Sequence, residues 1–157
     1  MNDVDVHWVQ AEPLTKEGFA PFGQVLAREP DEAVIELRGN EVFNLNILTY
    51  EHKPLRCDHL NAHYNATQAL FPMGRPTMLV VAPPGTDFDD LSKLDTVRAF
   101  LIDQTAGVNL AIGTWHWGPY PIGDRVDLIN LQGADFEHDN DIAYLERDLG
   151  AVVEVRL

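Results

Sequence analysis

The stretch TMLVVA, residues 77–82, is an apolar run with Pro76 on one side and Pro83 and Pro84 on the other. An apolar run of this length, bounded by prolines and rich in valine, is typical of a β-strand that is buried on both faces. The run therefore predicts a fold built around a sheet whose two faces are both covered.

Segments on both sides of this run carry further strand signals. In VFNLNILTY, residues 42–50, Phe43, Leu45 and Ile47 occupy one face of an extended chain. Asn44 and Asn46 occupy the other face, and this period of two is typical of a half-buried strand. Further strands are predicted at residues 4–8, 97–102, 126–131 and 151–157. Because turn signals separate these segments, we expect about ten short strands.

Helical signals are few. Residues 14–23 can form one short helical turn with Thr15 as its N-cap, and Gly18 and Pro21 limit its length. Residues 139–149 carry apolar side chains at helical spacing and predict a second short helix. The sequence therefore predicts an all-β protein with one or two short helices. The strand pattern by itself leaves a jelly roll, an up-and-down barrel and an immunoglobulin-like sandwich open.

The length and composition predict one globular domain over residues 1–157. Apolar residues make up 45% and charged residues 23% of the 157 residues, which is ordinary for a globular chain. No apolar run approaches the roughly 20 residues of a membrane helix, and the first ten residues lack the features of a secretory signal. The single cysteine, Cys57, has no internal disulfide partner. Together these features predict a cytoplasmic protein.

The formal net charge of −14 narrows the choice of partners. Nucleic acid is not expected, because phosphate binding needs a basic face. No membrane partner is expected either, and a small-molecule substrate remains. If that substrate is an anion, the pocket must be locally positive inside a negative protein. Neither a phosphate-binding loop nor a G-x-S-x-G nucleophile motif is present, so nucleotide binding and serine nucleophilic catalysis are not expected.

The stretch GTWHWGPYPIG, residues 113–123, carries the most unusual histidine. His116 lies between Trp115 and Trp117, and the glycines and prolines around them predict a rigid loop that displays the imidazole. A rigid segment that holds one imidazole is a common way to pre-organise a site. His63 is the second candidate, because it directly precedes a predicted strand. Each histidine could equally be an inert, hydrogen-bonded residue at a barrel rim.

A metal site is the obvious alternative for a β-barrel with histidines. His59 and His63 are four residues apart, so on one strand they would stand roughly 13 Å apart, too far to share one ion. The chain has no H-x-H pair, no H-E-x-x-H motif and no cluster of cysteine and histidine. We therefore predict that no cofactor is required, with a divalent metal ion as the weaker alternative.

Several cations could hold a substrate carboxylate by charge-assisted hydrogen bonds. The candidates are Arg38, Lys53, Arg56, Arg75, Arg98 and Arg125. Arg75 ranks first with Arg56, because Arg75 is held at a turn between a glycine and a proline and Arg56 is close in sequence to the histidine segment.

Four segments together resemble the ureidoglycolate lyase family, whose members were long called ureidoglycolate hydrolases. In chain order they are LTKEGFAPFGQVL, HYNATQALFPM, PTMLVVAPPG and VRAFLIDQTAGVNLAIGTWHWGPYPI, within residues 12–131. The sharpest marks are H-x-x-x-x-Q-A, which begins at His63 and includes Gln68, the motif A-G-V-N, which ends at Asn109, and the pair Trp115–His116.

The resemblance implies a cupin-like double-stranded β-helix barrel, a homodimer, and release of urea from ureidoglycolate to leave glyoxylate in allantoin breakdown. It implies that His63 and His116 are the catalytic acid and base, in an order it leaves open. The residues it assigns to substrate binding are Gln68, which would bind the ureido group, Arg75 or Arg56, which would hold the carboxylate, Trp115, which would wall the pocket, and Asn109.

The chain departs from the family pattern at several site positions. Asn61 stands where the family has a glutamate two residues before the histidine, and Trp117 replaces the second histidine of a W-H-H motif. Leu110 and Ala111 replace a Tyr-His pair, and Ile47 replaces an arginine. The competing interpretation is a cupin-like binding protein or a sugar isomerase or epimerase, because a fold does not determine a function.

Overall fold

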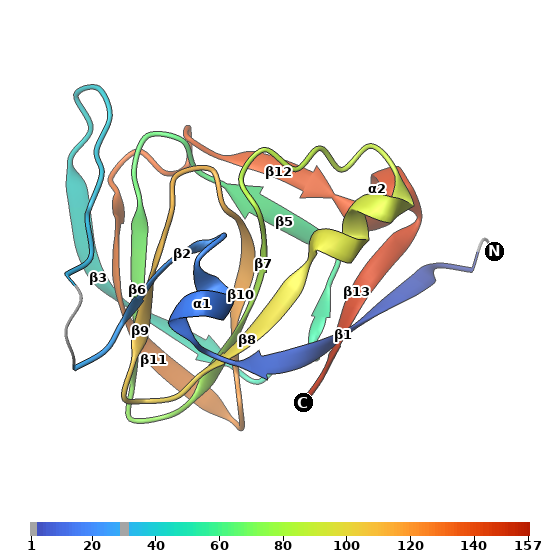
Figure 1. Cartoon of the computed structure of the whole chain (residues 1–157), viewed down its shortest axis with the longest axis horizontal. Helices are drawn as coiled ribbons and strands as arrows, with labels where there is room; N and C mark the ends of the chain where they lie inside the picture. Colours follow the sequence, from blue (N-terminus) through green and yellow to red (C-terminus); the bar gives the residue numbers. More distant parts are fainter. Residues whose placement is uncertain (1–2, 29–31) are drawn as a thin grey trace.

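The computed structural model describes residues 3–28 and 32–157, and Figure 1 shows the arrangement of its elements. The predicted domain boundary at residue 1 lies outside the described residues. The thirteen strands of the described residues are β1 (Asp5–Pro13), β2 (Gly23–Leu26), β3 (Phe43–Glu51), β4 (Arg56–Cys57), β5 (His59–Ala62), β6 (Gln68–Met73), β7 (Thr77–Ala82), β8 (Arg98–Ile102), β9 (Gly107–Leu110), β10 (Trp115–Pro121), β11 (Arg125–Gly133), β12 (Asp141–Tyr144) and β13 (Ala151–Arg156).

The strand order is that of a jelly roll. One sheet contains the order β5-β10-β7-β8 and the facing sheet the order β3-β11-β6-β9. Taken in chain order from β3, without the short β4, these eight strands switch between the sheets at every step except β7 to β8. They form two interleaved Greek keys, which is the jelly-roll pattern shared by the cupins. Strands β12, β1, β13 and β4 extend the first sheet, and β2 extends the second. The prediction of an all-β, cupin-like barrel is confirmed by this order.

Two apolar cores lie on the two faces of the larger sheet. Strand β7, which is the apolar run bounded by prolines, is buried at all six positions. Its Leu79 and Val81 pack into the inter-sheet core between the two sheets, and Met78 and Val80 pack into a second, outer core. The outer core also includes Leu145 of helix α2. The prediction that this strand is covered on both faces is confirmed.

The helices are short. Helix α1 (Lys16–Phe19) begins at the predicted cap, because the Thr15 side chain accepts a hydrogen bond from the Gly18 N–H. A 3-10 helix covers Leu91–Thr96. The prediction of one helix over residues 139–149 is wrong in its first half, which forms strand β12 against β5 and is followed by α2 (Leu145–Leu149). Pairing with a neighbouring strand overrides the local helical spacing there. Among the described residues no helix is both long and apolar enough to span a bilayer.

The asparagine face of β3 is the face that turns inward. Leu45 and Ile47 are 70% and 54% exposed, although they carry the apolar half of the alternating pattern. Asn44 and Asn46 on the other face line a cavity between the two sheets. The period of two is confirmed, and its polar half faces the cavity, where Asn44 and Asn46 remain exposed to solvent.

Candidate active site

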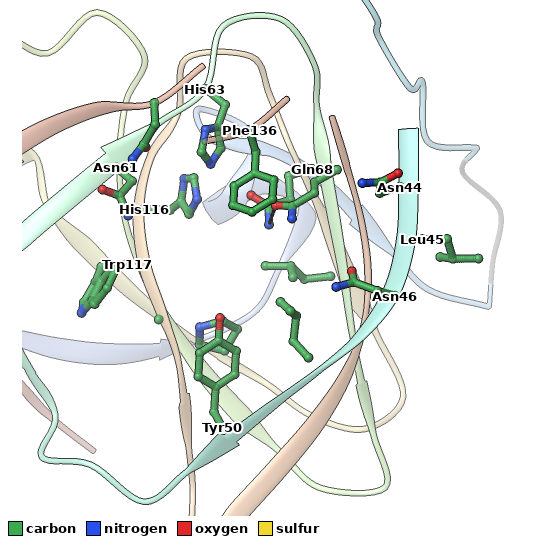
Figure 2. A pocket seen from close by; sticks show the side chains of 16 residues that line it. Asn44, Leu45, Asn46, Tyr50, Asn61, His63, Gln68, His116, Trp117 and Phe136 are labelled. Carbon is green, nitrogen blue, oxygen red and sulfur yellow. Dashed lines mark hydrogen bonds between the residues drawn. The ribbon is translucent and has the colours of Figure 1, made fainter. Parts of the chain in front are cut away.

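A cavity of about 420 Å³ opens between β3 of one sheet and β5 and β10 of the other. Figure 2 shows the two imidazoles, an amide and a phenyl ring around its upper part and a phenol below them. Its lining side chains of polar or aromatic character are Asn44, Asn46, Tyr50, Asn61, His63, Gln68, His116, Trp117, Gln132, Phe136 and Asn140. The cavity thus brings together His63, Gln68 and His116, three of the residues predicted from the sequence.

His116 reaches the cavity because of its position in a strand. The stretch that was predicted to be a rigid loop forms strand β10, so that prediction is wrong. His116 pairs with Val81 of β7 and with Asn61 of β5, on the side of the sheet that faces the barrel interior. The pairing with β7 shifts register between Trp117 and Tyr120, where Gly118 has a φ of +108° that few other residues adopt.

Trp115 lies on the opposite face of the same strand. Because successive side chains of a strand point to opposite faces, Trp115 packs into the outer core against Phe88 and donates its Nε1–H to the Thr86 carbonyl at 3.0 Å. The prediction that Trp115 walls the cavity is therefore wrong, and Trp117 lies at the cavity instead.

The two imidazoles face each other with their ring centroids 5.2 Å apart. The Nδ1 atom of His116 lies 3.0 Å from the Thr114 carbonyl oxygen, and that of His63 lies 2.5 Å from the Asp139 carbonyl oxygen. A carbonyl oxygen only accepts hydrogen bonds, so in the neutral form of each ring Nδ1 carries the proton. Each Nε2 is then left as a free proton acceptor.

Burial keeps His116 uncharged near neutral pH. Loss of solvation, followed by the charge of the neighbouring His63, lowers the pKa of His116 to about 4, and the hydrogen bond to Thr114 opposes this only in part. His116 is therefore a neutral base at neutral pH, with its lone pair on Nε2.

Gln68 is held by a ladder of amides that crosses the smaller sheet. Its Nε2 donates to Asn130 Oδ1 at 2.9 Å and to Gln132 Oε1 at 3.2 Å, and Asn130 Nδ2 donates to Asn46 Oδ1 at 2.8 Å. Both protons of the Gln68 amide are thus used within the protein. Its carbonyl oxygen is left with a fixed orientation.

Two buried acceptors on the cavity wall have no hydrogen-bond partner among the described residues. They are the side-chain oxygens Oε1 of Gln68 and Oδ1 of Asn61. Buried polar atoms are nearly always hydrogen-bonded, because an unpaired one costs about 1–3 kcal/mol. A cavity with two unpaired acceptors therefore suits a ligand that carries N–H or O–H donors.

Three other predicted substrate-binding residues lie away from the histidines. Arg56 forms an ion pair with Glu154 at 3.2 Å, and Arg75 lines a separate cavity beside Arg125. Asn109 donates to the Val34 carbonyl at 3.0 Å and lines another surface hollow. The structure therefore does not bring these three together with the histidines, and none of the three lines the cavity that contains them.

Sequence reasoning did not single out several residues that the cavity contains. Tyr50 points its hydroxyl toward the cavity (Figure 2), and burial raises the pKa of that phenol, so it stays a donor. Asn46 belongs to the amide ladder, and its signal was an asparagine in a strand, where that residue is uncommon. Phe136 comes from the segment between β11 and β12, which carried no recognisable pattern.

Lys53 lies against the same cavity walls. Its Nζ is 5.0 Å from the Tyr50 ring centroid, 5.2 Å from that of Trp117 and 4.6 Å from that of Tyr120. Such contacts between a cation and ring faces are attractive. Burial lowers the pKa of Lys53. Because the described residues that line the cavity include no lysine or arginine, Lys53 is a cation of interest for an anionic ligand.

The donor set of the cavity gives limited support for a metal ion. The two free Nε2 atoms are suitable ligands, but the remaining oxygens on the wall are neutral amides and a phenol. No group of three or more histidine, cysteine, aspartate or glutamate side chains that could hold an ion occurs among the described residues. His59 stacks on Trp117 with ring centroids 3.8 Å apart and is paired with Asp58, away from His63. The expectation that no cofactor is required stays a prediction.

The fold and the cavity define a class of protein: a cupin-like jelly-roll barrel with a histidine pair inside. Within this class, the chain belongs to the ureidoglycolate lyase family, a family of carbon–nitrogen lyases, whose sequence model matches residues 36–152. The ureidoglycolate lyase of Pseudomonas paraeruginosa is 33% identical over 140 residues, which cover 77% of this chain and 80% of that protein. That of Pseudomonas fluorescens is 28% identical over 156 residues, which cover 87% and 91%.

Among solved structures, a mutant of Bacillus subtilis oxalate decarboxylase is similar with a TM-score of 0.44 and 16% sequence identity. The match covers 87% of this chain and 30% of that chain.

Proposed function

We propose that this protein cleaves ureidoglycolate to glyoxylate and urea, as part of allantoin and purine breakdown. Membership of the ureidoglycolate lyase family supports this reaction class. The observation that carries the proposal is the convergence of His63, His116 and Gln68 in one cavity. Cleavage of an N-acyl hemiaminal requires a base for its hydroxyl proton and an acid for the departing nitrogen, and two facing imidazoles can supply both.

The proposed mechanism assigns the two proton transfers to different histidines. Nε2 of neutral His116 takes the proton of the substrate hydroxyl, the oxygen electrons form the C=O bond of glyoxylate, and the C–N bond breaks with its electron pair on nitrogen. The Nε2–H of protonated His63 gives a proton to that nitrogen, and urea leaves. The low pKa of His116 supports this order, because His116 is the ring that is neutral before reaction. Proton exchange with solvent then restores both rings.

The ureido group of the substrate matches the unpaired acceptors of the cavity. It carries three N–H bonds, and the oxygens Gln68 Oε1 and Asn61 Oδ1 both lack a donor. The amide ladder would hold Gln68 ready for this contact, so the substrate would bind without reorganising the amide.

The substrate carboxylate requires a partner other than Arg56 or Arg75. We propose that the Tyr50 hydroxyl and the charge of Lys53 take this role. Lys53 has aromatic rings around its ammonium, two of which line the cavity, so little water screens its charge from that side.

Three further expectations belong to this proposal. The chain would act as one cupin-like domain over residues 1–157, as a homodimer, and in the cytoplasm, without nucleic-acid or membrane partners. Light scattering on a size-exclusion column measures the subunit number directly, and a monomer at micromolar concentration would contradict the homodimer.

A substrate screen tests the function. Purified protein is expected to convert ureidoglycolate to glyoxylate and urea without release of ammonia. Because a protein of net charge −14 repels an anion at long range, kcat/KM should hold or rise with added salt if association limits the rate. Turnover of a related 2-hydroxy acid adduct alone would keep the lyase class and replace the substrate. Saturable binding of a sugar with no turnover of any adduct would favour the binding-protein interpretation.

A further inference from the structure

The segment that joins β11 to β12 forms part of the cavity wall. It contributes Phe136 and Asn140 to the lining, and Figure 2 shows Phe136 beside His63 and facing His116. The segment is tied to the loop before β3, because the Asp135 N–H donates to Glu41 Oε1 at 2.6 Å. Asp139, near the end of this segment, is not among the described residues that line the cavity, but it contacts His63.

Asp139 holds the chain around His63 by two different groups. Its carboxylate accepts hydrogen bonds from the Tyr64 N–H, at 2.9 and 3.1 Å to its two oxygens, and from the Asn65 N–H at 2.8 Å. Its backbone carbonyl accepts from Nδ1 of His63 at 2.5 Å. The carboxylate therefore fixes the position of the carbonyl that the imidazole needs.

The orientation of His63 depends on this contact. With Nδ1–H directed at the Asp139 carbonyl, Nε2 is the ring atom left for the cavity and for the partner ring of His116. A ring free to rotate would turn Nε2, and the proton that the protonated ring donates from it, away from the substrate. A misplacement of about 1 Å can lower a rate about 10²-fold.

We propose that Asp139 is a positioning residue that fixes the orientation and tautomer of His63. This role rests on the proposed function for its effect on turnover, although the tautomer itself does not. Asp139 acts through His63 and touches no substrate. Its hydrogen-bond partners His63, Tyr64 and Asn65 lie 76, 75 and 74 positions away in sequence, so the contacts exist only once β5 and β12 have paired.

The test compares Asp139→Ala with Asp139→Asn and with Asp141→Ala. Asparagine keeps an acceptor oxygen for the backbone N–H groups and should restore most of the effect. Asp141 is the matched control, since its carboxylate accepts from the Tyr64 hydroxyl at 3.2 Å and from the Ile142 N–H but does not contact His63. If the alanine variant does not fold, Asp139→Ser replaces it, because its single short hydroxyl does not span both N–H groups.

Two measurements are made on each variant, one of the His63 tautomer and one of the kinetics. Long-range ¹H–¹⁵N correlation spectra, recorded where the ring is neutral, should show His63 with its proton on Nδ1 in the native protein and in Asp141→Ala. In Asp139→Ala a second population with the proton on Nε2 is expected. In parallel, kcat should fall about 10- to 100-fold in Asp139→Ala while KM changes little, and Asp141→Ala should keep native kcat.

The spectra test the positioning role of Asp139, and the kinetics test the proposed lyase function. A native tautomer in a folded Asp139→Ala protein would overturn the positioning role, whatever the activity. If the native protein turns over no ureidoglycolate, the proposed function fails, and the spectra still decide whether Asp139 sets the tautomer of His63.

Discussion

Trp115 and His116 are neighbours in the chain, and their side chains lie on opposite faces of one sheet. Trp115 is 7% exposed in the outer core, against Phe88, where its contacts are apolar and its one polar atom is hydrogen-bonded. His116 is 8% exposed in the cavity, where its Nδ1 atom contacts the Thr114 carbonyl and its Nε2 atom is the one left for a ligand. Equal burial therefore accompanies two different roles.

The contrast between Trp115 and His116 shows that burial alone does not identify a functional site. Trp115 and His116 are equally shielded from water, but His116 shares its face with polar side chains and space for a ligand. On the outer face Trp115 packs against Phe88 with its Nε1–H hydrogen-bonded, so substitutions there should change stability. On the barrel face they should change activity.

Replacement of the histidines gives the largest expected effect. Removal of a positioned acid or base costs about 10²–10⁴-fold in rate, so His116→Ala and His63→Ala should each lower kcat/KM by about 10²-fold or more. Both proteins should stay folded by circular dichroism. Native kcat/KM in a stable His116→Ala protein would remove the central residue of the proposed mechanism.

Trp115→Ala tests the opposite face. Loss of a buried indole should lower the free energy of unfolding by about 3–5 kcal/mol, because it leaves a cavity in the outer core. Urea unfolding followed by fluorescence measures this change. The folded fraction should keep kcat/KM within about threefold of native, since a change away from the reacting groups costs little transition-state binding. A large loss of kcat with native stability would contradict the assignment of a purely structural role to Trp115.

The depressed pKa of His116 predicts a loss of stability in mild acid. Its folded pKa, about 4, lies below the ordinary value of 6.5 that the unfolded chain would have. Above pH 6.5 His116 is neutral in both the folded and the unfolded chain, so its protonation does not change the free energy of unfolding. As the pH falls from 6.5 to 4, the unfolded chain takes up the proton first, and stability falls by about 3 kcal/mol at 1.36 kcal/mol for each pKa unit.

Urea unfolding curves recorded between pH 4 and pH 7.5 measure this contribution of His116 to stability. Carboxylates elsewhere also titrate in this range, so the measured quantity is the difference between the native protein and His116→Gln, which lacks the titrating ring. Parallel curves for the two proteins would contradict the assignment.

Lys53→Met should have a smaller effect, confined to binding. Removal of the charge near the cavity should raise KM for an anionic substrate about tenfold and leave kcat within about threefold, as expected for loss of uniform binding. Arg75→Met is the matched control, because Arg75 lies in a separate cavity, and it should leave KM unchanged. A higher KM in Arg75→Met with native KM in Lys53→Met would instead favour Arg75 as the partner of the substrate carboxylate.

Removal of metal should have the smallest effect. If no cofactor is required, dialysis against a chelator should leave both Tm and kcat unchanged, and elemental analysis should find no stoichiometric metal. A bound divalent ion whose removal lowers Tm would show that the two free imidazole nitrogens serve as ligands, and the acid–base mechanism would then need revision.

Several features of the site could be predicted from the sequence because they depend on local pattern. His63, Gln68 and His116 stand in short motifs, and these three meet in the cavity. Arg56 and Arg75 were chosen by their neighbours in the chain, and the distance to the cavity depends on strand pairings that such neighbours do not reveal. Phe136 carried no signal for a site, and Asp139 began a stretch that was predicted to be helical. The role of Asp139 arises from contact with a segment about 75 residues away, which local pattern does not reveal.

Local sequence patterns were enough to predict the strand-rich class, the buried strand at residues 77–82, the cap at Thr15 and, through the motifs, the family. The assembled sheets determine which face of each strand turns inward. On β3 they turn Asn44 and Asn46 toward the cavity and leave Leu45 exposed, and on β10 they separate His116 from Trp115. The physical reason is that a period of two defines two faces but not their direction. That choice is made by the pairing of strands from distant parts of the chain and by the packing that follows.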